Sequence, residues 1–209
     1  MIVETFPVGL LQCNCTILGD ETTREATVID PGDDPSLILA KLKHHGLTLR
    51  EIVCTHTHID HVGAIFELQR QAGTPAAIHK ADLFLFEALD TQAEWLGMPS
   101  PPKGTIDRFL NDGSSAGCRG VELGVIHTPG HTPGSTCFLL ANDRNILFAG
   151  DTLFKNSIGR TDLWGGSTSD ILASIHKRLM TLDDDTLVIT GHGPSTTVGL
   201  ERRNNPFLR

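Results

Sequence analysis

The sequence predicts an α/β protein in which helices cover the outside of layered β-sheets. Short apolar runs of strand type alternate with segments whose apolar residues recur at helical spacing. The order strands, helix, strand, helix is followed by strands, helix, strand, so the chain falls into two similar halves. Its 209 residues contain no linker and no low-complexity stretch, which indicates one domain spanning residues 1–209.

In the first half, apolar runs predict the strands, and start and stop residues predict the helices. Asp34 followed by Pro35 indicates a helix start, and Gly46 indicates the end of that helix. Gly73 ends a second helix that is predicted within His58–Ala72. The remaining predicted elements are strands at Cys15–Leu18, Ala26–Ile29, Glu51–Cys54 and Ala77–His79, and a third helix at Ala81–Leu89.

The second half follows a proline-containing segment, Thr91–Gly104, which we predict to be a surface loop. A turn at Ala141–Asn145 is expected to join two of the later strands. Ser167 with Asp170 resembles a capping box and predicts a helix after the glycine-rich segment Asp151–Ser167. The strands predicted in this half are Val121–Ile126, Thr136–Leu140, Ile146–Ala149 and Leu187–Thr190.

The composition excludes several classes of function. The 17 Lys and Arg residues against 25 Asp and Glu give a formal charge of −8, which opposes binding to nucleic acids or anionic membranes. Glu4 stands where a signal peptide carries positive charge, and no apolar run approaches the roughly 20 residues of a membrane span. The five cysteines form no C-x-x-C pair, as in proteins with reduced thiols. We therefore expect a cytoplasmic protein.

A histidine motif, Thr55-His56-Thr57-His58-Ile59-Asp60-His61, is the strongest feature of the sequence. It places four potential metal ligands within six positions, directly after a predicted strand and at the start of a helix. Residues two apart in an extended segment point to one side, so His56 and His58 can share one metal. Asp60 and His61 lie at the turn into the helix and are better placed for a second metal.

Further metal-binding side chains follow other predicted strands. His131 lies in the turn Thr128–Gly134, Asp151 follows a strand and Gly150, and His192 follows the last strand. One edge of the sandwich can gather these strand-end residues with the motif. Five histidines and two aspartates would bind two borderline divalent metals. Asp30 also ends a strand, either to hydrogen-bond the metal-site loops or simply to form a turn.

With these motifs the chain resembles the metallo-β-lactamase-fold hydrolases, and among them the short glyoxalase II-like enzymes. The resemblance implies a four-layer αββα sandwich. It covers nearly the whole chain and is carried by Asp30-Pro31-Gly32, the histidine motif, His131, Asp151, Gly159-Arg160-Thr161-Asp162, Gly191-His192-Gly193 and Asn205-Pro206-Phe207-Leu208.

The resemblance also implies a role for each ligand-type residue. Two divalent metal ions are expected, zinc first, with iron or manganese as alternatives. One would be bound by three histidines and the other by Asp60 and two histidines, and we also predict Asp60 as a catalytic residue. The implied assignments are His56, His58 and His131 for the first metal, Asp60, His61 and His192 for the second, and Asp151 bridging both.

Two adjacent metals suggest a hydrolase. They hold a bridging water and lower its pKa from about 15.7 towards about 7, and one can polarise the carbonyl under attack. A thioester needs no general acid, because a thiol of pKa about 8.5 departs readily as thiolate. The predicted reaction is therefore hydrolysis of a small-molecule thioester. The resemblance makes it S-D-lactoylglutathione, giving D-lactate and glutathione.

Substrate binding is less well defined by the sequence. Only 17 residues follow His192, so we expect no C-terminal helical substrate domain of the two-domain glyoxalase II type. Arg160 matches a glutathione-binding lysine of those enzymes and could hold a carboxylate with two hydrogen bonds. The equal alternative is a structural pair with Asp162. Trp95, in the predicted loop, could cover the site, although a plain surface loop is the favoured interpretation.

Four other functions remain as alternatives. A glutathione persulfide dioxygenase with one iron is the nearest, since similar enzymes share Gly-Arg-Thr-Asp and the ligand set. A β-lactamase is disfavoured by Asp151, which stands where many such enzymes have cysteine. A nuclease would need a basic surface, and a non-catalytic metal domain would fill every coordination position with protein. The sequence leaves the oligomeric state open.

Overall fold

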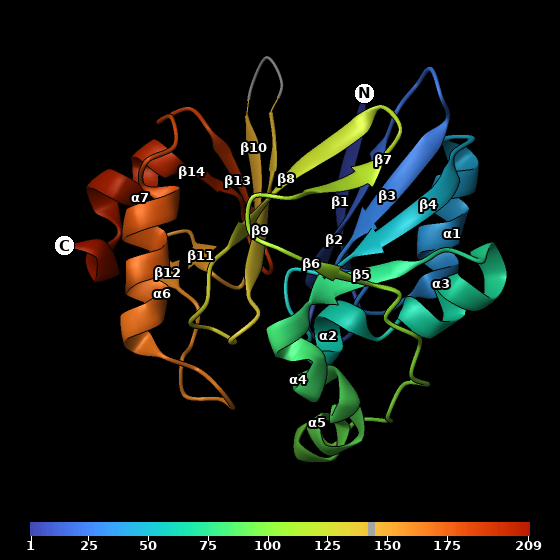
Figure 1. Cartoon of the computed structure of the whole chain (residues 1–209), viewed down its shortest axis with the longest axis horizontal. Helices are drawn as coiled ribbons and strands as arrows, with labels where there is room; N and C mark the ends of the chain where they lie inside the picture. Colours follow the sequence, from blue (N-terminus) through green and yellow to red (C-terminus); the bar gives the residue numbers. More distant parts are fainter. Residues whose placement is uncertain (142–144) are drawn as a thin grey trace.

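Two facing β-sheets form the centre of the molecule (Figure 1). The structure, a computed structural model, describes residues 1–141 and 145–209. Each of the two sheets has six strands, in the orders β1-β2-β3-β4-β5-β6 and β14-β13-β10-β9-β8-β7. Helices α1 (Pro35–His44) and α3 (Ile65–Ala72) cover the first sheet, and α6 (Thr168–Ser174) and α7 (Val198–Asn204) cover the second. The predicted four-layer αββα sandwich is confirmed.

The strands of the first sheet are β1 (Ile2–Val8), β2 (Cys13–Gly19), β3 (Glu25–Ile29), β4 (Thr48–Val53), β5 (Ala76–His79) and β6 (Arg108–Leu110). Those of the second are β7 (Ser115–Cys118), β8 (Val121–His127), β9 (Thr136–Leu140), β10 (Ile146–Gly150), β13 (Leu187–Thr190) and β14 (Thr196–Thr197). A small hairpin pairs β11 (Leu153–Phe154) with β12 (Ser157–Ile158). The remaining helical segments are η1 (Lys80–Asp82), α2 (Ile59–Val62), α4 (Leu83–Glu87), α5 (Leu89–Leu96), η2 (Ile175–Leu179) and η3 (Pro206–Leu208).

Alternate residues of each strand serve different layers. In β2, Leu18 packs between the two sheets while Ile17 packs beneath the helices of the first sheet. Phe138 and Phe148 of the second sheet are buried in the same central layer as Leu18. This alternation follows from the two-residue period of a strand, and it gives the sandwich one central and two outer cores.

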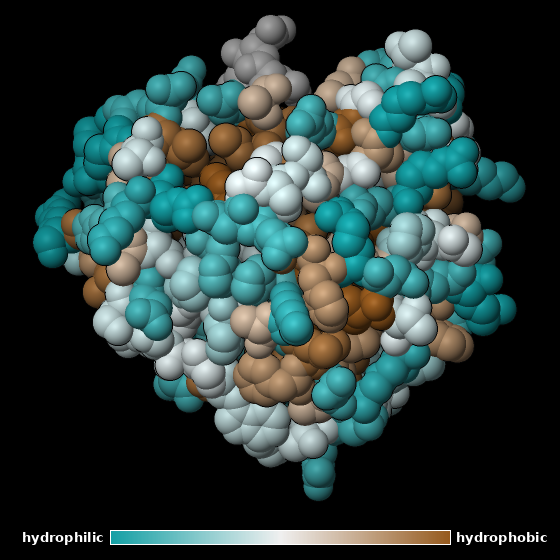
Figure 2. Space-filling model, viewed as in Figure 1, coloured by the Kyte–Doolittle hydropathy of each residue, from teal (hydrophilic) through white to brown (hydrophobic). Residues whose placement is uncertain are grey.

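Polar residues cover the outer helices, and hydrophobic residues gather over α4 and β6 on the face shown in Figure 2.

Parallel pairing brings several strand ends to one edge of the sandwich. Ile29 of β3 pairs with Val53 of β4, and Gly150 of β10 pairs with Thr190 of β13. The chain therefore leaves four strands at the same edge, in the two sheets. Asp30, the histidine motif, Asp151 and His192 directly follow these ends.

The predicted strands and the helices starting at Pro35 and after Ser167 are present. The loop predicted at Thr91–Gly104 is confirmed for residues 97–104 but wrong for residues 91–96. Residues 89–96 form α5, because Leu89 and Ala93 are buried on one side and Gly97 ends the helix in the left-handed conformation. The prolines beyond it only prevent the helix from continuing. Strands β1, β6 and β7 and helix α7 were also not predicted. The turn predicted at Ala141–Asn145 contains residues 142–144, which lie outside the described residues.

Among the described residues, no helix combines the length and the apolar character that a membrane crossing requires.

Candidate metal centre

The histidine motif is held in an extended loop between β4 and α2. The backbone N–H and the hydroxyl of Thr55 both donate to the Asp30 carboxylate, each at 2.7 Å. The Thr57 hydroxyl donates to the carbonyl of Asp82 at 2.8 Å. Two threonines therefore anchor the loop, and the alternating residues His56 and His58 are directed to the other side.

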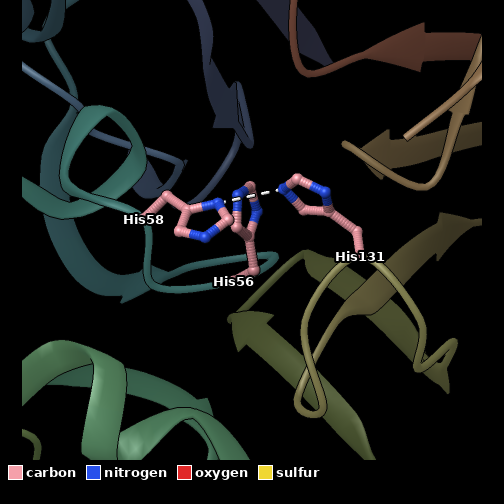
Figure 3. A group of neighbouring side chains, drawn as sticks. All are labelled: His56, His58 and His131. Carbon is pink, nitrogen blue, oxygen red and sulfur yellow. Dashed lines mark hydrogen bonds between the residues drawn. The ribbon is translucent and has the colours of Figure 1, made fainter. Parts of the chain in front are cut away.

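Three histidines form one group of potential ligands (Figure 3). His131 reaches His56 and His58 from the turn after β8, and its Nε2 lies 3.0 Å from Nδ1 of His58. The centroids of the three rings are 4.7 to 4.8 Å apart in every pair. Among the described residues, Nε2 of His56 is buried without a hydrogen-bond partner. A metal ion would satisfy this nitrogen, so the group fits one.

Asp60, His61 and His192 form the second group. Nε2 of His192 lies 3.1 Å from Oδ2 of Asp60 and 3.3 Å from Nε2 of His61. Asp60 and His61 come from the first turn of α2, and His192 follows β13. The group therefore draws its residues from segments that follow strands of both sheets. Its one carboxylate and two imidazoles suit a borderline divalent metal.

Asp151 lies between the two groups. Its Oδ1 is 3.5 Å from Nε2 of His61, and its Oδ2 is 3.6 Å from Nε2 of His131. Within the described residues, Oδ1 is buried without a hydrogen-bond partner. Gly191, which follows β13, leaves room for this oxygen, because a Cβ at this position would lie 2.0 Å from Oδ1 of Asp151. One carboxylate oxygen thus faces each group, as a bridging ligand requires.

Hydrogen bonds behind the rings fix their orientation. Nδ1 of His131 donates to the Arg160 carbonyl at 2.7 Å, and Nδ1 of His192 donates to the Leu11 carbonyl at 2.9 Å. Nδ1 of His61 donates to the Asp30 carboxylate at 3.0 Å. In each ring this leaves Nε2 facing the centre, the arrangement that metal-binding histidines commonly have. Asp30 therefore does hydrogen-bond the metal-site residues.

The first group is held in the neutral form that binds metals. Burial lowers the pKa of His56 well below its ordinary range and that of His58 to about 3. Burial also lowers the pKa of His131, against the opposing effect of Asp151. Neutral imidazoles keep a lone pair on the nitrogen that faces the centre, so these rings need lose no proton to ligate.

The second group is more strongly influenced by carboxylates. Burial lowers the pKa of His61, but Cys13, Asp60 and further carboxylates outweigh it and raise this pKa well above its ordinary value. The pKa of His192 is also raised, since Asp60 and Asp151 outweigh burial. For Asp60 burial acts upward, but the neighbouring histidines hold its pKa below its ordinary value. Anionic oxygens at this position suit a cation.

A cavity of about 340 Å³ opens beside both groups. Its apolar walls include two residues that the sequence analysis did not single out, Leu11 and Trp164. Trp95, predicted to lie in a plain surface loop, is on α5 and lines this cavity. The lining residues are Leu11, His58, Ile59, Asp60, Leu85, Gln92, Trp95, Leu96, His131, Asp151, Arg160, Leu163 and Trp164.

Arg160 is both paired and next to the cavity. Its Nε and Nη2 donate to the two oxygens of Asp162 at 2.7 and 2.8 Å, so the pair considered from the sequence is formed. Both side chains are largely exposed, at 61% and 69%, which keeps such a pair weak in water. The pairing leaves Nη1 of Arg160 for another acceptor.

The remaining histidines lie outside the centre. His45 contacts Glu4 at 2.7 Å, and the rings of His79 and His127 stack with centroids 4.0 Å apart. His44 is in the last turn of α1, and His176 is in η2.

Comparison with known proteins identifies the family. The family model of the metallo-beta-lactamase superfamily matches residues 8–192. The chain therefore belongs to this superfamily. Its members are typically metal-dependent hydrolases whose fold binds divalent metal ions. An uncharacterized protein of Mycobacterium leprae is 41% identical over 100% of this chain and 99% of its own. A Haemophilus influenzae protein named hydroxyacylglutathione hydrolase GloC is 37% identical over 100% and 98%.

Solved structures show the same fold. BLEG-1, described as a B3 metallo-beta-lactamase, superposes with a TM-score of 0.91 at 36% identity, covering 99% of both chains. TTHA1623, crystallised in a di-iron-bound form, gives 0.85 at 39% identity, covering 99% of this chain and 100% of its own. ETHE1 from Myxococcus xanthus gives 0.83 at 27% identity, covering 99% and 84%.

Proposed function

We propose that this protein hydrolyses a small-molecule thioester, S-D-lactoylglutathione, to D-lactate and glutathione. The observation that carries the proposal is the pair of ligand groups joined by Asp151 at the base of the cavity. Among the described residues lining that cavity, the titratable side chains are potential ligands, apart from Arg160. A thiolate leaving group needs no general acid, so a thioester suits such a site.

Each group would hold one divalent ion. We propose His56, His58 and His131 for one ion, Asp60, His61 and His192 for the other, and Asp151 between them. Bound there, two ions would supply hydroxide at neutral pH and polarise the thioester carbonyl. Zinc suits the nitrogen and oxygen ligands, and iron suits them as well.

Asp60 would have a second role beyond holding metal. Its carboxylate lines the cavity, and Oδ2 lies 3.1 Å from Nε2 of His192. A reacting group in the cavity would therefore meet Asp60 directly. We propose it as a catalytic residue, whose low pKa keeps it ionised and able to orient a proton donor.

One relative supports a thioester as the substrate, and one structural neighbour favours a second candidate. The Haemophilus influenzae relative carries the name hydroxyacylglutathione hydrolase. The similarity to BLEG-1 favours β-lactam hydrolysis as the competing activity. An amine is a much poorer leaving group than a thiolate and needs a proton, and the lining residues offer no free acid for it.

The charge of −8 supports a small-molecule partner rather than a nucleic acid or membrane. All five cysteines are free, four of them buried, which supports our proposal of a cytoplasmic location.

Metal analysis combined with three assays tests the proposal. Purified, metal-replete protein should contain two divalent ions per chain and hydrolyse S-D-lactoylglutathione but not nitrocefin, a β-lactam. One iron per chain, with oxygen consumed on addition of glutathione persulfide, would replace the hydrolase with the dioxygenase. Nitrocefin turnover without thioester hydrolysis would favour the lactamase.

A further inference from the structure

The two tryptophans of this chain meet at one place, the cavity beside the metal centre. Trp95 comes from α5 and Trp164 from the segment between β12 and α6. Their ring centroids are 4.0 Å apart with an interplanar angle of 67°. Both line the cavity together with His58, Asp60 and His131, although they remain 57% and 40% exposed. Two large apolar rings thus lie in the wall of the cavity, partly exposed to solvent.

The segment that carries each tryptophan is hydrogen-bonded to a segment that carries potential ligands. Gln92, one turn before Trp95, is buried, and its amide binds the Ile59 N–H at 2.9 Å and the Thr57 carbonyl at 3.3 Å. It thereby connects α5 to the histidine motif. On the other side, the N–H of Ser167 donates to the Gly130 carbonyl at 2.8 Å, next to His131. The two segments that carry the tryptophans are therefore hydrogen-bonded to the segments that carry the potential ligands.

The two rings and Arg160 offer a defined set of interactions. Within the described parts of the chain, neither indole N–H donates a hydrogen bond, so both remain available to a ligand. Arg160 is the one permanent cation among the described residues that line the cavity, and its Nη1 is unused by Asp162. The wall therefore combines apolar faces with donors. It suits a molecule with peptide planes, carbonyl oxygens and a carboxylate.

Size decides which part of a thioester lies there. With its carbonyl carbon at the metal centre, a lactoyl group extends only two further carbons. A cavity of about 340 Å³ is in the range that holds a whole small molecule. The larger thiol portion is therefore the part that reaches the tryptophans.

We propose that Trp95 and Trp164 form the thiol-binding subsite and select thioesters of peptide-like thiols. This inference rests on the proposed thioester hydrolysis. The indole faces would pack on the peptide planes and methylene groups of the thiol, and Arg160 would bind its terminal carboxylate. These residues recognise the thiol rather than the acyl group.

Fluorescence tests the subsite directly. The chain has two tryptophans and no tyrosine, so emission excited at 295 nm comes from this pair alone. S-methylglutathione, a thioether that cannot be hydrolysed, should change the emission of metal-loaded protein saturably. Trp95→Phe and Trp164→Phe should each keep binding but alter the emission change. Phe207→Ala, at an exposed residue of η3, is the matched control and should behave as wild type.

Kinetics distinguishes the thiol side from the acyl side. Trp95→Ala and Trp164→Ala should each raise KM for S-D-lactoylglutathione about ten-fold with metal content unchanged, while the Phe variants recover most of this loss. The same rise should occur with S-mandeloylglutathione, which changes only the acyl group. It should disappear with the lactoyl thioester of 2-mercaptoethanol, a small thiol that has neither a peptide plane nor a carboxylate. A rise in KM that depends on the acyl group and not on the thiol would instead overturn the subsite.

The two proposals can fail separately. Hydrolysis of S-D-lactoylglutathione without an emission change on adding S-methylglutathione would overturn the subsite and leave the hydrolase. An emission change without hydrolysis would leave the subsite and overturn the hydrolase. If neither occurs with two metals bound, both are wrong.

Discussion

At the scale of single residues, Asp151 is the side chain on which the proposed two-metal arrangement depends most. Two cations a few ångströms apart repel, and a carboxylate with one oxygen toward each group offsets that repulsion. Asp151→Ala should therefore lose one metal and most of the activity, and Asp151→Asn should also be poor because a neutral amide bridges badly. Metal content and turnover are measured together. Asp170→Ala, an exposed carboxylate of α6, is the control. Two retained metals with normal turnover would refute the bridging role.

Arg160 distinguishes a substrate contact from a structural pair. If it binds a glutathione carboxylate, Arg160→Ala removes a hydrogen bond to a charged group worth roughly 1.5–3 kcal/mol. The KM for S-D-lactoylglutathione should rise about ten- to a hundred-fold with metal content unchanged, and Arg160→Lys should recover part. Asp162→Ala is the matched control, since it removes the pair but keeps the cation. Unfolding or metal loss in Arg160→Ala would instead indicate a structural role.

The grouping of the ligand-type residues could be predicted because each follows the end of a strand. Strand ends are visible in the sequence, and parallel strands bring their ends to one edge. The meeting of Trp95 and Trp164 could not be predicted, because it depends on how α5 and a loop of the other half pack. The Arg160–Asp162 pair was one of two predicted alternatives, the other being substrate binding by Arg160. The two-residue spacing alone does not decide whether the guanidinium also binds a substrate carboxylate.

At the scale of elements, Asp82 connects the two loops that carry the three-histidine group. It is fully buried at the end of η1. Its carboxylate accepts hydrogen bonds from the Thr132 hydroxyl at 2.7 Å, the Gly134 N–H at 2.5 Å and the Thr57 N–H at 3.3 Å. Burial raises its pKa from 3.8 to about 6, and the hydrogen bonds oppose this rise. Nothing in the sequence marks Asp82, since an aspartate at a helix start is ordinary.

This pKa predicts a pH dependence of stability. The folded chain binds the Asp82 proton more tightly than the unfolded chain does. The stabilisation of the fold by this proton is therefore fully present below about pH 4 and is lost as the pH rises through about 6. The difference between 3.8 and about 6 corresponds to roughly 3 kcal/mol. Asp82→Asn should remove this slope. Urea unfolding of both proteins at pH 4 to 7 measures it, and subtracting the two curves cancels the titration of the histidines. A difference independent of pH would contradict the prediction.

Helix α5 shows why some elements escaped prediction. Leu89, Ala93 and Gly97 carry the spacing and the stop residue of a helix, but the nearby prolines favoured a loop. The helix forms because its buried side packs against α2 and α4, a tertiary interaction that local propensity does not contain. Short strands such as β6 and β7 escaped for the same reason.

At the scale of the whole molecule, the layer arrangement followed from the sequence because two periodicities, of strands and of helices, repeat in both halves. The order of the strands did not, since it depends on which edges pair across the sandwich. The candidate metal centre lies where the two halves meet, with Asp60 and His61 from the first and His131, Asp151 and His192 from the second. Bound metal would therefore connect both sheets.

Metal removal should lower the stability of the whole fold for this reason. An ion that binds only the folded chain stabilises it by about 4 kcal/mol when its concentration is about 1,000 times its Kd. Chelation removes both proposed ions, so the loss at this concentration is about 8 kcal/mol. For a chain of 209 residues this corresponds to a Tm lower by about 20 °C. Differential scanning calorimetry of chelated and zinc-reloaded protein at neutral pH measures the difference. In Asp151→Ala the same difference should shrink, because one of the two ions is already lost. Equal melting temperatures with and without metal would show that the two halves are held together without it.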